Sequence, residues 1–295
     1  MLQRFLDPAT LASINGLDLI AKTVVDGFVA GLHRSPDFGF SQEFAEYRAY
    51  TPGDDLRHVD WNVFARSERM YLKRYRGETN SQLLILLDTS ASMGYGSHAV
   101  NKLDFARYMA ACLCYMASQQ RDAAGLIVFD EDVKNYIAPS TRQGQLFRLL
   151  HAVEKAEVGT HTDFAKPFVH FQQFLHRRGI VVVLSDFYDQ PETIIKTVEP
   201  LRFRGNEVIL FHVLDPHEIK PAFREPVLLL DMEDKSSLEV TPEYARTEYR
   251  VKIDAHIENL ASATRRAGME YFLMNTGRPL DEGLREYLSI RQGRM

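Results

Sequence analysis

The sequence predicts an α/β protein with a doubly wound, mainly parallel sheet that carries helices on both faces. Two apolar runs, Leu83–Leu87 and Ile180–Leu184, are continuous rather than alternating, which is typical of strands buried on both faces. Stretches with helical periodicity separate the apolar runs, as in parallel sheets joined by crossover helices. An irregular N-terminal α+β segment precedes them, and we expect it to pack on the sheet.

The composition is that of a globular chain, which we divide into residues 1–80 and 81–295. The 295 residues are 45% hydrophobic and 25% charged, enough for a full core. The net charge of −5 argues against a general nucleic-acid binder. No apolar run approaches the roughly 20 residues of a membrane span, and Met1–Ala12 lacks the pattern of a secretion signal. We therefore expect a cytoplasmic protein without an integral membrane segment.

The N-terminal region combines one predicted helix with short strands and turns. Apolar residues at helical spacing predict the helix over Leu11–Leu32. From His33 to Arg76 the pattern changes to strand-like pieces and turns, and Met70–Tyr75 alternates as an edge strand does. We hypothesise that Asp54–Arg66 packs on the sheet, because so short a region could barely sustain a core alone.

The rest of the chain alternates between strands and helices. Short apolar runs predict strands, and apolar residues at every third or fourth position predict helices. The expected strands are Leu83–Leu87, Ala123–Phe129, Asp132–Ala138, Gly179–Leu184, Glu207–Leu214, Val227–Leu230 and Met269–Met274. The expected helices are Leu103–Gln119, Gly144–Val153, Phe164–His176, Gln190–Phe203, Pro242–Ala267 and Leu280–Arg291.

Polar side chains follow two of the buried strands. Asp88, Ser90 and Ser92 occupy every second position after the first strand, and open α/β sheets bind ligands at the carboxyl ends of their strands. A carboxylate and two hydroxyls are oxygen ligands, which hard cations such as Mg²⁺ prefer. Asp186 closes a later strand. In the doubly wound order these two strands are neighbours, so Asp88 and Asp186 would face each other across one crevice.

Three short motifs occur in a set order along the chain. They are Asp88-x-Ser90-x-Ser92, Gly159-Thr160-His161-Thr162 and Leu184-Ser185-Asp186. Together they resemble the metal-ion-dependent adhesion site of von Willebrand factor A domains, which are Rossmann-like in fold. The resemblance implies Ser90 and Ser92 as direct ligands and Thr160 as the loop ligand, with Asp88 and Asp186 bonding to the metal or its waters. It implies Mg²⁺ as the cofactor, with Mn²⁺ and Ca²⁺ as the other candidates.

A second pattern runs from Glu43 to Glu78. It includes Tyr47-Arg48-x-Tyr50-x-Pro52-Gly53-Asp54-Asp55 and Val59-Asp60-Trp61. This pattern resembles the bacterial family labelled domain of unknown function fifty-eight, whose members join it to a von Willebrand A-like domain and are typically encoded beside a MoxR-type AAA+ ATPase. The resemblance implies a non-enzymatic adaptor that works with such an ATPase or its client. The adaptor would bind an exposed Asp or Glu of its protein partner through the metal.

Two other classes of function stay open. One is a Mg²⁺-dependent hydrolase built on Asp88, although Ser90 stands where a haloacid-dehalogenase-like phosphatase has a second aspartate. The sequence contains neither the Gly-x-x-x-x-Gly-Lys-Ser/Thr loop of nucleotide hydrolases nor a Gly-x-Ser-x-Gly elbow. The other class is a metal-free structural module, in which Ser and Asp after a strand only cap the next helix. We expect Asp54, Asp55 and Asp60 to form a turn with arginine partners rather than a second metal site.

Overall fold

The computed structural model describes residues 8–14, 16–32, 44–50, 61–67, 69–75, 82–159, 165–171, 178–202, 205–230 and 236–292. The chain divides into two compact units, one made of residues 1–26 and 81–295 and the other of residues 27–80. The first unit contains the large sheet. It also includes residues 1–26, which we had grouped with the N-terminal region.

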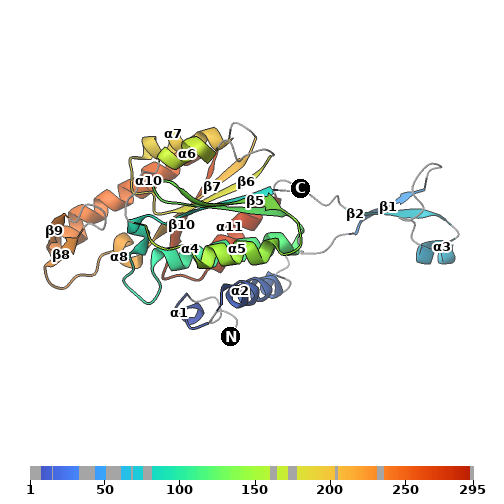
Figure 1. Ribbon diagram of the computed structural model, residues 1–295, viewed down its shortest axis with the longest axis horizontal. Helices are drawn as coiled ribbons and strands as arrows, with labels where there is room; N and C mark the ends of the chain where they lie inside the picture. Colours follow the sequence, from blue (N-terminus) through green and yellow to red (C-terminus); the bar gives the residue numbers. More distant parts are fainter. Residues whose placement is uncertain are drawn as a thin grey trace. The chain divides into compact units, whose positions relative to one another are not determined.

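The large sheet is built from β3 (Gln82–Asp88), β4 (Ala123–Phe129), β5 (Val133–Ser140), β6 (Gly179–Ser185), β7 (Glu207–Leu214) and β10 (Glu270–Asn275). Its strand order is β10-β7-β6-β3-β4-β5 (Figure 1). The strands are parallel except for β5, which runs antiparallel to β4. The predicted doubly wound, mainly parallel sheet is confirmed, and β3 lies beside β6 as expected.

Helices cover both faces of this sheet (Figure 1). The helices α4 (Lys102–Gln119), α5 (Gln145–Glu154) and α11 (Asp281–Gln292) lie on one face, and α6 (Ala165–Phe171), α7 (Pro191–Arg202) and α10 (Arg250–Arg266) lie on the other. Leu84 and Leu86 pack in the core beneath α6, α7 and α10. Alternate residues of a strand point to opposite faces, so Leu83, Ile85 and Leu87 are directed to the α4 side. All five are buried, which explains why the apolar run is continuous.

Two N-terminal helices, α1 (Pro8–Leu11) and α2 (Leu17–Leu32), replace the single helix expected over Leu11–Leu32. That expectation was wrong because the chain turns between them, with Gly16 at φ +97°. Glycine adopts this left-handed conformation without the penalty of a side chain. Ala21 of α2 packs against Ala111 of α4 and Leu150 of α5. The first half of α2 therefore adds to the helical layer on that face.

In the second unit, β1 (Phe44–Ala49) and β2 (Tyr71–Tyr75) form an antiparallel pair. The edge strand predicted over Met70–Tyr75 is thus confirmed as β2. The helix α3 (Trp61–Ser67), which the sequence did not predict, lies between the strands in the chain and holds Trp61 edge-to-face against Phe64. The predicted turn of Asp54, Asp55 and Asp60 falls outside the described residues.

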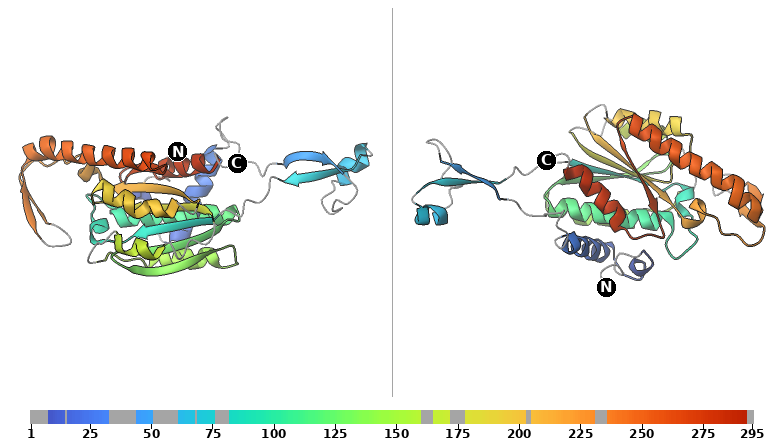
Figure 2. Two further views of the ribbon diagram at one scale, coloured as in Figure 1. Left: turned by 90° about the horizontal axis from the view of Figure 1, so that it is seen from above. Right: turned by 180° about the vertical axis from the view of Figure 1, so that it is seen from behind.

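After β7 the first unit forms an arm. It comprises α8 (Pro216–Ile219), the hairpin of β8 (Val227–Leu230) and β9 (Ser237–Val240), α9 (Pro242–Tyr244) and a π-helical turn, η5 (Ala245–Tyr249), which continues into α10. Figure 2 shows the hairpin at the tip of the long α10 helix, beyond the sheet. The strand expected over Val227–Leu230 is confirmed, but it pairs with β9 rather than with the large sheet. None of the helices in the described ranges has the length and apolar character needed to cross a membrane.

Candidate functional site

Four adjacent strands of the sheet each end in an aspartate. In the order of the sheet these are Asp215 after β7, Asp186 after β6, Asp88 at the end of β3 and Asp130 after β4. Each is at most 3% exposed. Parallel strands present their carboxyl ends at one edge, so the topology gathers residues that are distant in sequence. The sequence predicted Asp88 and Asp186 but missed Asp130 and Asp215, although both also follow apolar strands.

The two outer aspartates have partners within the protein. Asp215 accepts hydrogen bonds from the backbone N–H of Ser97 at 2.8 Å, the hydroxyl of Ser97 at 2.5 Å and the backbone N–H of His217 at 2.8 Å. Asp130 forms an ion pair with Lys134 at 3.0 Å. Both carboxylates are therefore already bound by groups of the protein itself.

Asp186 is paired with a buried lysine. Lys102, the first residue of α4, places its Nζ 2.7 Å from Asp186 Oδ2 and 2.6 Å from Glu218 Oε1, and its side chain is 0% exposed. Burial acts to lower the pKa of Lys102, but the charges of Asp186 and Glu218 outweigh it and raise the pKa. The ring of Tyr188 lies 4.9 Å from Nζ, within the range of a cation–π contact. Lys102 is thus a buried ammonium ion.

The sequence analysis missed Lys102 and Glu218, although both leave a signal. A lysine in the first turn of a helix faces the positive end of the helix dipole, so a specific acidic partner is to be expected. Asp215-Pro216-His217-Glu218 has the spacing of a capping box, and Glu218 Oε2 accepts the backbone N–H of Asp215 at 2.8 Å. The cap holds the Glu218 carboxylate beside Lys102.

Asp88 has no ion pair of the kind that Asp186 and Asp130 form. Its Oδ1 accepts the backbone N–H of Ser90 at 2.8 Å, and its Oδ2 accepts the hydroxyl of Ser185 at 2.6 Å. Within the described ranges it forms no ion pair. Burial, and after it the charge of Asp186, raise the pKa of Asp88 to about 7, although the hydrogen bonds from Ser185 and Ser90 act in the opposite direction. A cation bound to Asp88 would offset the free-energy cost of burying the charged carboxylate and its repulsion from Asp186.

The two predicted hydroxyl ligands lie side by side next to Asp88. The oxygens of Ser90 and Ser92 are 3.2 Å apart, and Ser90 is fully buried. Ser90 precedes the 3₁₀ turn η3 (Ala91–Gly94), yet its side chain makes no capping hydrogen bond to that turn. The cap of α4 is supplied by Asn101 instead. Helix capping therefore does not explain the Ser90 side chain.

The second motif of the sequence, Gly159-Thr160-His161-Thr162, is described only at Gly159, which lies at the same edge. Its backbone N–H donates to the carbonyl of Thr89 at 2.6 Å, directly after Asp88. A side chain at Gly159 would collide with the carboxylate of Asp130, so this close approach requires glycine. Thr160 itself lies outside the described residues, and its role as a ligand stays a prediction.

The described residues fit a hard cation at Asp88 better than at Asp186. Ligands at 2.0–2.1 Å in an octahedral shell place neighbouring oxygens about 3 Å apart, close to the 3.2 Å between the Ser90 and Ser92 hydroxyls. No three His, Cys, Asp or Glu side chains in the described part of the chain gather as a metal site. A cation here would therefore depend on hydroxyl ligands, while Asp186 already has the Lys102 ammonium as its partner.

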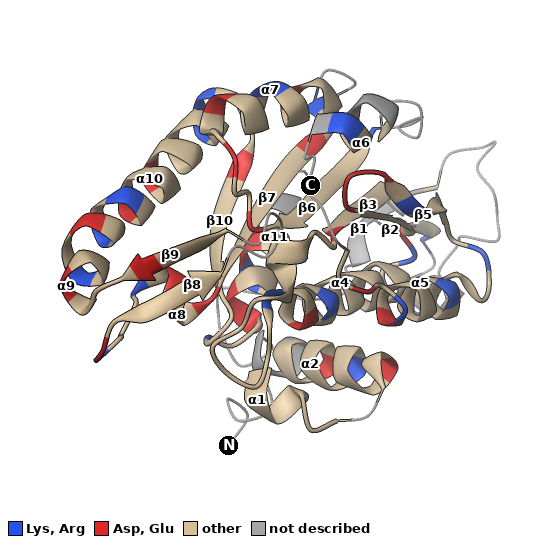
Figure 3. Cartoon of the chain, turned by 60° about the vertical axis from the view of Figure 1, so that its left-hand side comes forward, with Lys and Arg blue, Asp and Glu red and all other residues tan. Residues whose placement is uncertain are grey.

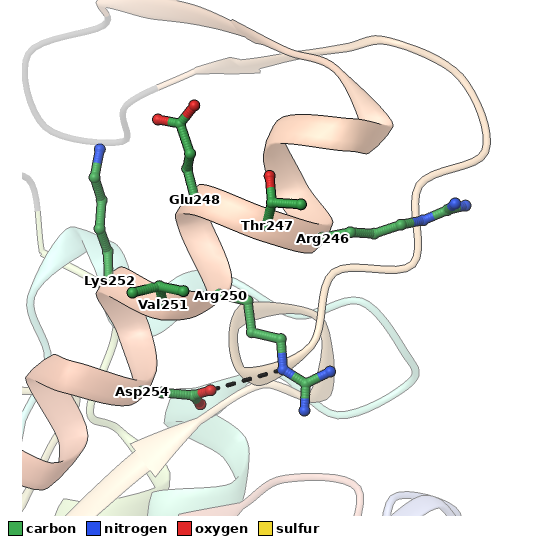
Figure 4. Close-up of a pocket in the computed structure, with 7 residues that line it drawn as sticks. All are labelled: Arg246, Thr247, Glu248, Arg250, Val251, Lys252 and Asp254. Atoms are coloured by element: carbon green, nitrogen blue, oxygen red, sulfur yellow. Dashed lines mark ion pairs between the residues drawn. The ribbon is translucent and has the colours of Figure 1, made fainter.

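A second surface feature lies on the arm. An open pocket of about 690 Å³ is lined by Arg246, Thr247, Glu248, Arg250, Val251, Lys252 and Asp254 (Figure 4). Arg250 Nε and Asp254 Oδ2, one turn apart on α10, form an ion pair at 3.6 Å (Figure 4). Basic and acidic residues are interspersed along α10 (Figure 3). The hairpin beside this helix exposes more than half of the surface of Leu228, Leu230 and Leu238.

Comparison with known proteins gives relatives without an assigned function. The uncharacterized protein Rv1480 of Mycobacterium tuberculosis is 28% identical over 294 residues, which cover 97% of this chain and 92% of the relative. Mb1516 of Mycobacterium bovis, also uncharacterized, matches to the same extent.

Solved structures with a similar arrangement include BatB from Bacteroides thetaiotaomicron, at a TM-score of 0.47 and 12% identity over 71% of this chain and 97% of that one. They also include the SpRpn10 VWA domain, at a TM-score of 0.40 and 10% identity over 68% of this chain and 92% of that one. The fold assignment rests on the strand order of the chain itself. The model of the family described as protein of unknown function DUF58 matches residues 46–270, more than half of the chain, and the protein therefore belongs to this family.

Proposed function

We propose that the protein is a non-enzymatic, metal-dependent adaptor that binds a protein partner through a divalent cation. One observation carries this proposal: the buried Asp88 forms no ion pair within the described residues, and the hydroxyl oxygens of Ser90 and Ser92 lie beside it. Asp88, Ser90 and Ser92 would hold the cation, with Thr160 as the loop ligand and Asp186 acting through water.

Mg²⁺ is the cation that suits this set of ligands, with Mn²⁺ and Ca²⁺ as alternatives, because all the ligands are oxygen atoms. Asp88 would be the direct carboxylate ligand, because Asp186 is paired with Lys102. A bound Mg²⁺ would then keep positive charge and offer an electrophilic position for a carboxylate oxygen of a partner. The residues of this chain orient the carboxylate that would hold the ion. Hydrogen bonds from Ser185 and Ser90 direct the Asp88 carboxylate before any ligand arrives.

The partner in this proposal is a MoxR-type AAA+ ATPase, or its client, in the cytoplasm. The exposed leucines of the arm support a protein partner, because large apolar side chains that are more than half exposed are common in protein interfaces. The arm starts at α8, directly after Asp215, so the apolar hairpin and the strand-end aspartates belong to the same end of the sheet. A partner could contact both.

Calorimetric titration of metal-stripped protein with Mg²⁺ and Mn²⁺ tests the proposal. We expect binding by the wild type and its loss in Asp88→Ala and Ser90→Ala. Ser289→Ala is the matched control, because it removes an exposed hydroxyl on α11 that donates to the Glu286 carbonyl at 2.8 Å. If the wild type bound neither ion, or if the control lost binding as fully as Ser90→Ala, the proposed function would be wrong.

Two alternatives are separated by simple measurements. For a hydrolase built on Asp88, the wild type would release phosphate from p-nitrophenyl phosphate in Mg²⁺ and Asp88→Asn would not. No histidine in the described part of the chain is hydrogen-bonded to the hydroxyls of Ser90 or Ser92, which favours binding over nucleophilic chemistry. For a metal-free structural module, Mg²⁺ would leave the melting temperature unchanged, whereas a ligand at a hundredfold excess over Kd stabilises by about 2.7 kcal/mol.

A further inference from the structure

We propose that Lys102 is a positioning residue of the metal site, which holds the Asp186 carboxylate away from the cation and thereby limits the metal affinity. This inference rests on the proposed function. It concerns a residue that belongs to none of the motifs on which the metal site was predicted.

The geometry assigns Lys102 to Asp186 rather than to solvent. The ammonium group is fully buried and forms short ion pairs with Asp186 Oδ2 at 2.7 Å and Glu218 Oε1 at 2.6 Å. The rings of Tyr188 and Tyr95 lie 4.9 Å and 5.9 Å from Nζ. Two carboxylates and two aromatic rings thus surround the ammonium, and there is no route by which it can leave without breaking both ion pairs.

The backbone of Lys102 is also held in place by hydrogen bonds. It is the first residue of α4, its N–H donates to the carbonyl of Tyr95 at 3.0 Å, and Asn101 caps the helix before it. Glu218 is fixed as well, since its second oxygen accepts the backbone N–H of Asp215. The ammonium is therefore a permanent positive charge at one side of the proposed site, and its position is determined by two helix starts.

This arrangement has a consequence for the cation. The ammonium and a divalent ion would compete for the negative charge of Asp186, because both are cations within reach of one carboxylate. With Asp186 paired to Lys102, the direct carboxylate ligand of the metal is Asp88 alone. Fewer carboxylates leave the ion weakly held but more electrophilic, which favours capture of a carboxylate from a partner.

Two substitutions should move the Mg²⁺ affinity in opposite directions. Lys102→Met removes the competing charge at similar length, so we expect Mg²⁺ to bind about tenfold tighter or more. Glu218→Gln removes a negative charge and leaves the ammonium with Asp186 as its remaining anionic partner, so we expect weaker binding. Lys102→Arg keeps the positive charge and should resemble the wild type. A purely structural role of Lys102 would not increase the affinity for a metal.

Calorimetry with Mg²⁺, together with melting temperatures in EDTA and in Mg²⁺, measures these effects. Lys166→Met is the matched control, because Lys166 forms its ion pair with Asp132, at 3.0 Å, on the surface. We expect Lys102→Met to melt lower than the wild type in EDTA, since it leaves Asp186 and Glu218 buried and unpaired, and to gain more than the wild type from Mg²⁺.

The possible failures are distinguishable. If the wild type bound Mg²⁺ and Lys102→Met bound it equally or more weakly, the role of Lys102 would be wrong and the metal site would stand. If neither protein bound Mg²⁺, the proposed function and this inference would both be wrong. If Lys102→Met failed to fold, Glu218→Gln decides, and unchanged or tighter binding by that variant would overturn the inference.

Discussion

The hydroxyl of Ser185 donates a 2.6 Å hydrogen bond to Asp88 Oδ2, which joins the ends of β6 and β3. The same hydroxyl oxygen accepts the backbone N–H of Phe187 at 3.0 Å, so its hydrogen is directed toward Asp88. Phe187 adopts φ +49°, a left-handed conformation that is unfavourable for a bulky residue. Such strain is often found at functional sites, and here it accompanies the sharp turn that follows Asp186.

Ser185→Ala should destabilise the protein and raise the pKa of Asp88 further, because this hydrogen bond favours the charged carboxylate. Loss of a buried bond to a charged group costs about 1.5–3 kcal/mol, which urea unfolding at pH 8 would measure. Ser13→Ala is the control, since Ser13 donates a bond of equal length to the Thr10 carbonyl at an exposed position. An equal loss in both variants would contradict the special role of Ser185.

Asp88→Asn should stabilise the metal-free protein at pH 8. The pKa of Asp88 is raised from 3.8 to about 7 in the folded state, so between these values the folded state binds the proton more tightly than the unfolded state. The wild type therefore loses stability as pH rises from about 4 to 7, and asparagine avoids this loss. At roughly 1.4 kcal/mol per pKa unit, we expect a gain of a few kcal/mol at pH 8 that shrinks toward pH 4.

Urea unfolding at the two pH values, with and without Mg²⁺, measures this effect. Mg²⁺ should stabilise the wild type and leave Asp88→Asn unchanged. The control is Asp132→Asn, whose carboxylate is exposed. A lower stability of Asp88→Asn than of the wild type at pH 8 in EDTA would show that the charge of Asp88 does not destabilise the metal-free protein.

His212 should make the fold sensitive to acid. It is fully buried on β7, where its Nδ1 lies 2.7 Å from the hydroxyl of Tyr271. Burial and the neighbouring His256 lower the pKa of His212 from 6.5 to about 3. The unfolded state then binds more protons between pH 6.5 and 3, so the contribution of His212 is present above pH 6.5 and is lost as pH falls toward 3.

His212→Gln, made in the Asp88→Asn background to remove the opposing carboxyl effect, should flatten the decline of stability between pH 6.5 and 4. Urea unfolding across this range is the measurement, and His151→Gln on the exposed face of α5 is the control. A decline as steep in His212→Gln as in its parent would show that another group is responsible.

The hairpin leucines should contribute to partner binding rather than to stability. Leu228 and Leu230 are 62% and 65% exposed, so replacing both with serine should change the free energy of unfolding by no more than about 0.5 kcal/mol per site. We expect at least a tenfold loss of affinity for a purified MoxR-type ATPase in Mg²⁺. Phe147→Ser is the control, because Phe147 is 75% exposed on α5. Equal binding by wild type and the double variant would exclude the hairpin from the interface.

Local sequence patterns were sufficient to predict the sheet. Leu83–Leu87 and Ile180–Leu184 are buried from both sides, and strands in that position consist mainly of apolar residues, so burial is visible in the sequence. The break at Gly16 and the helix α3 were not predicted, because short helices depend more on contacts and on single backbone angles than on periodicity.

The sequence by itself predicted the strands of the large sheet and placed Asp88, Ser90, Ser92 and Asp186 directly after two of them, because these polar residues follow apolar runs. Only the tertiary structure decided how those carboxylates are neutralised. Lys102 meets Asp186, 84 positions away, through the packing of α4 at the sheet edge. Ion pairs of this kind depend on distance in space, which strand order and helix placement set. Residue spacing along the chain does not show them, and so it did not reveal that Asp186 is paired with Lys102 while Asp88 forms no ion pair in the described chain.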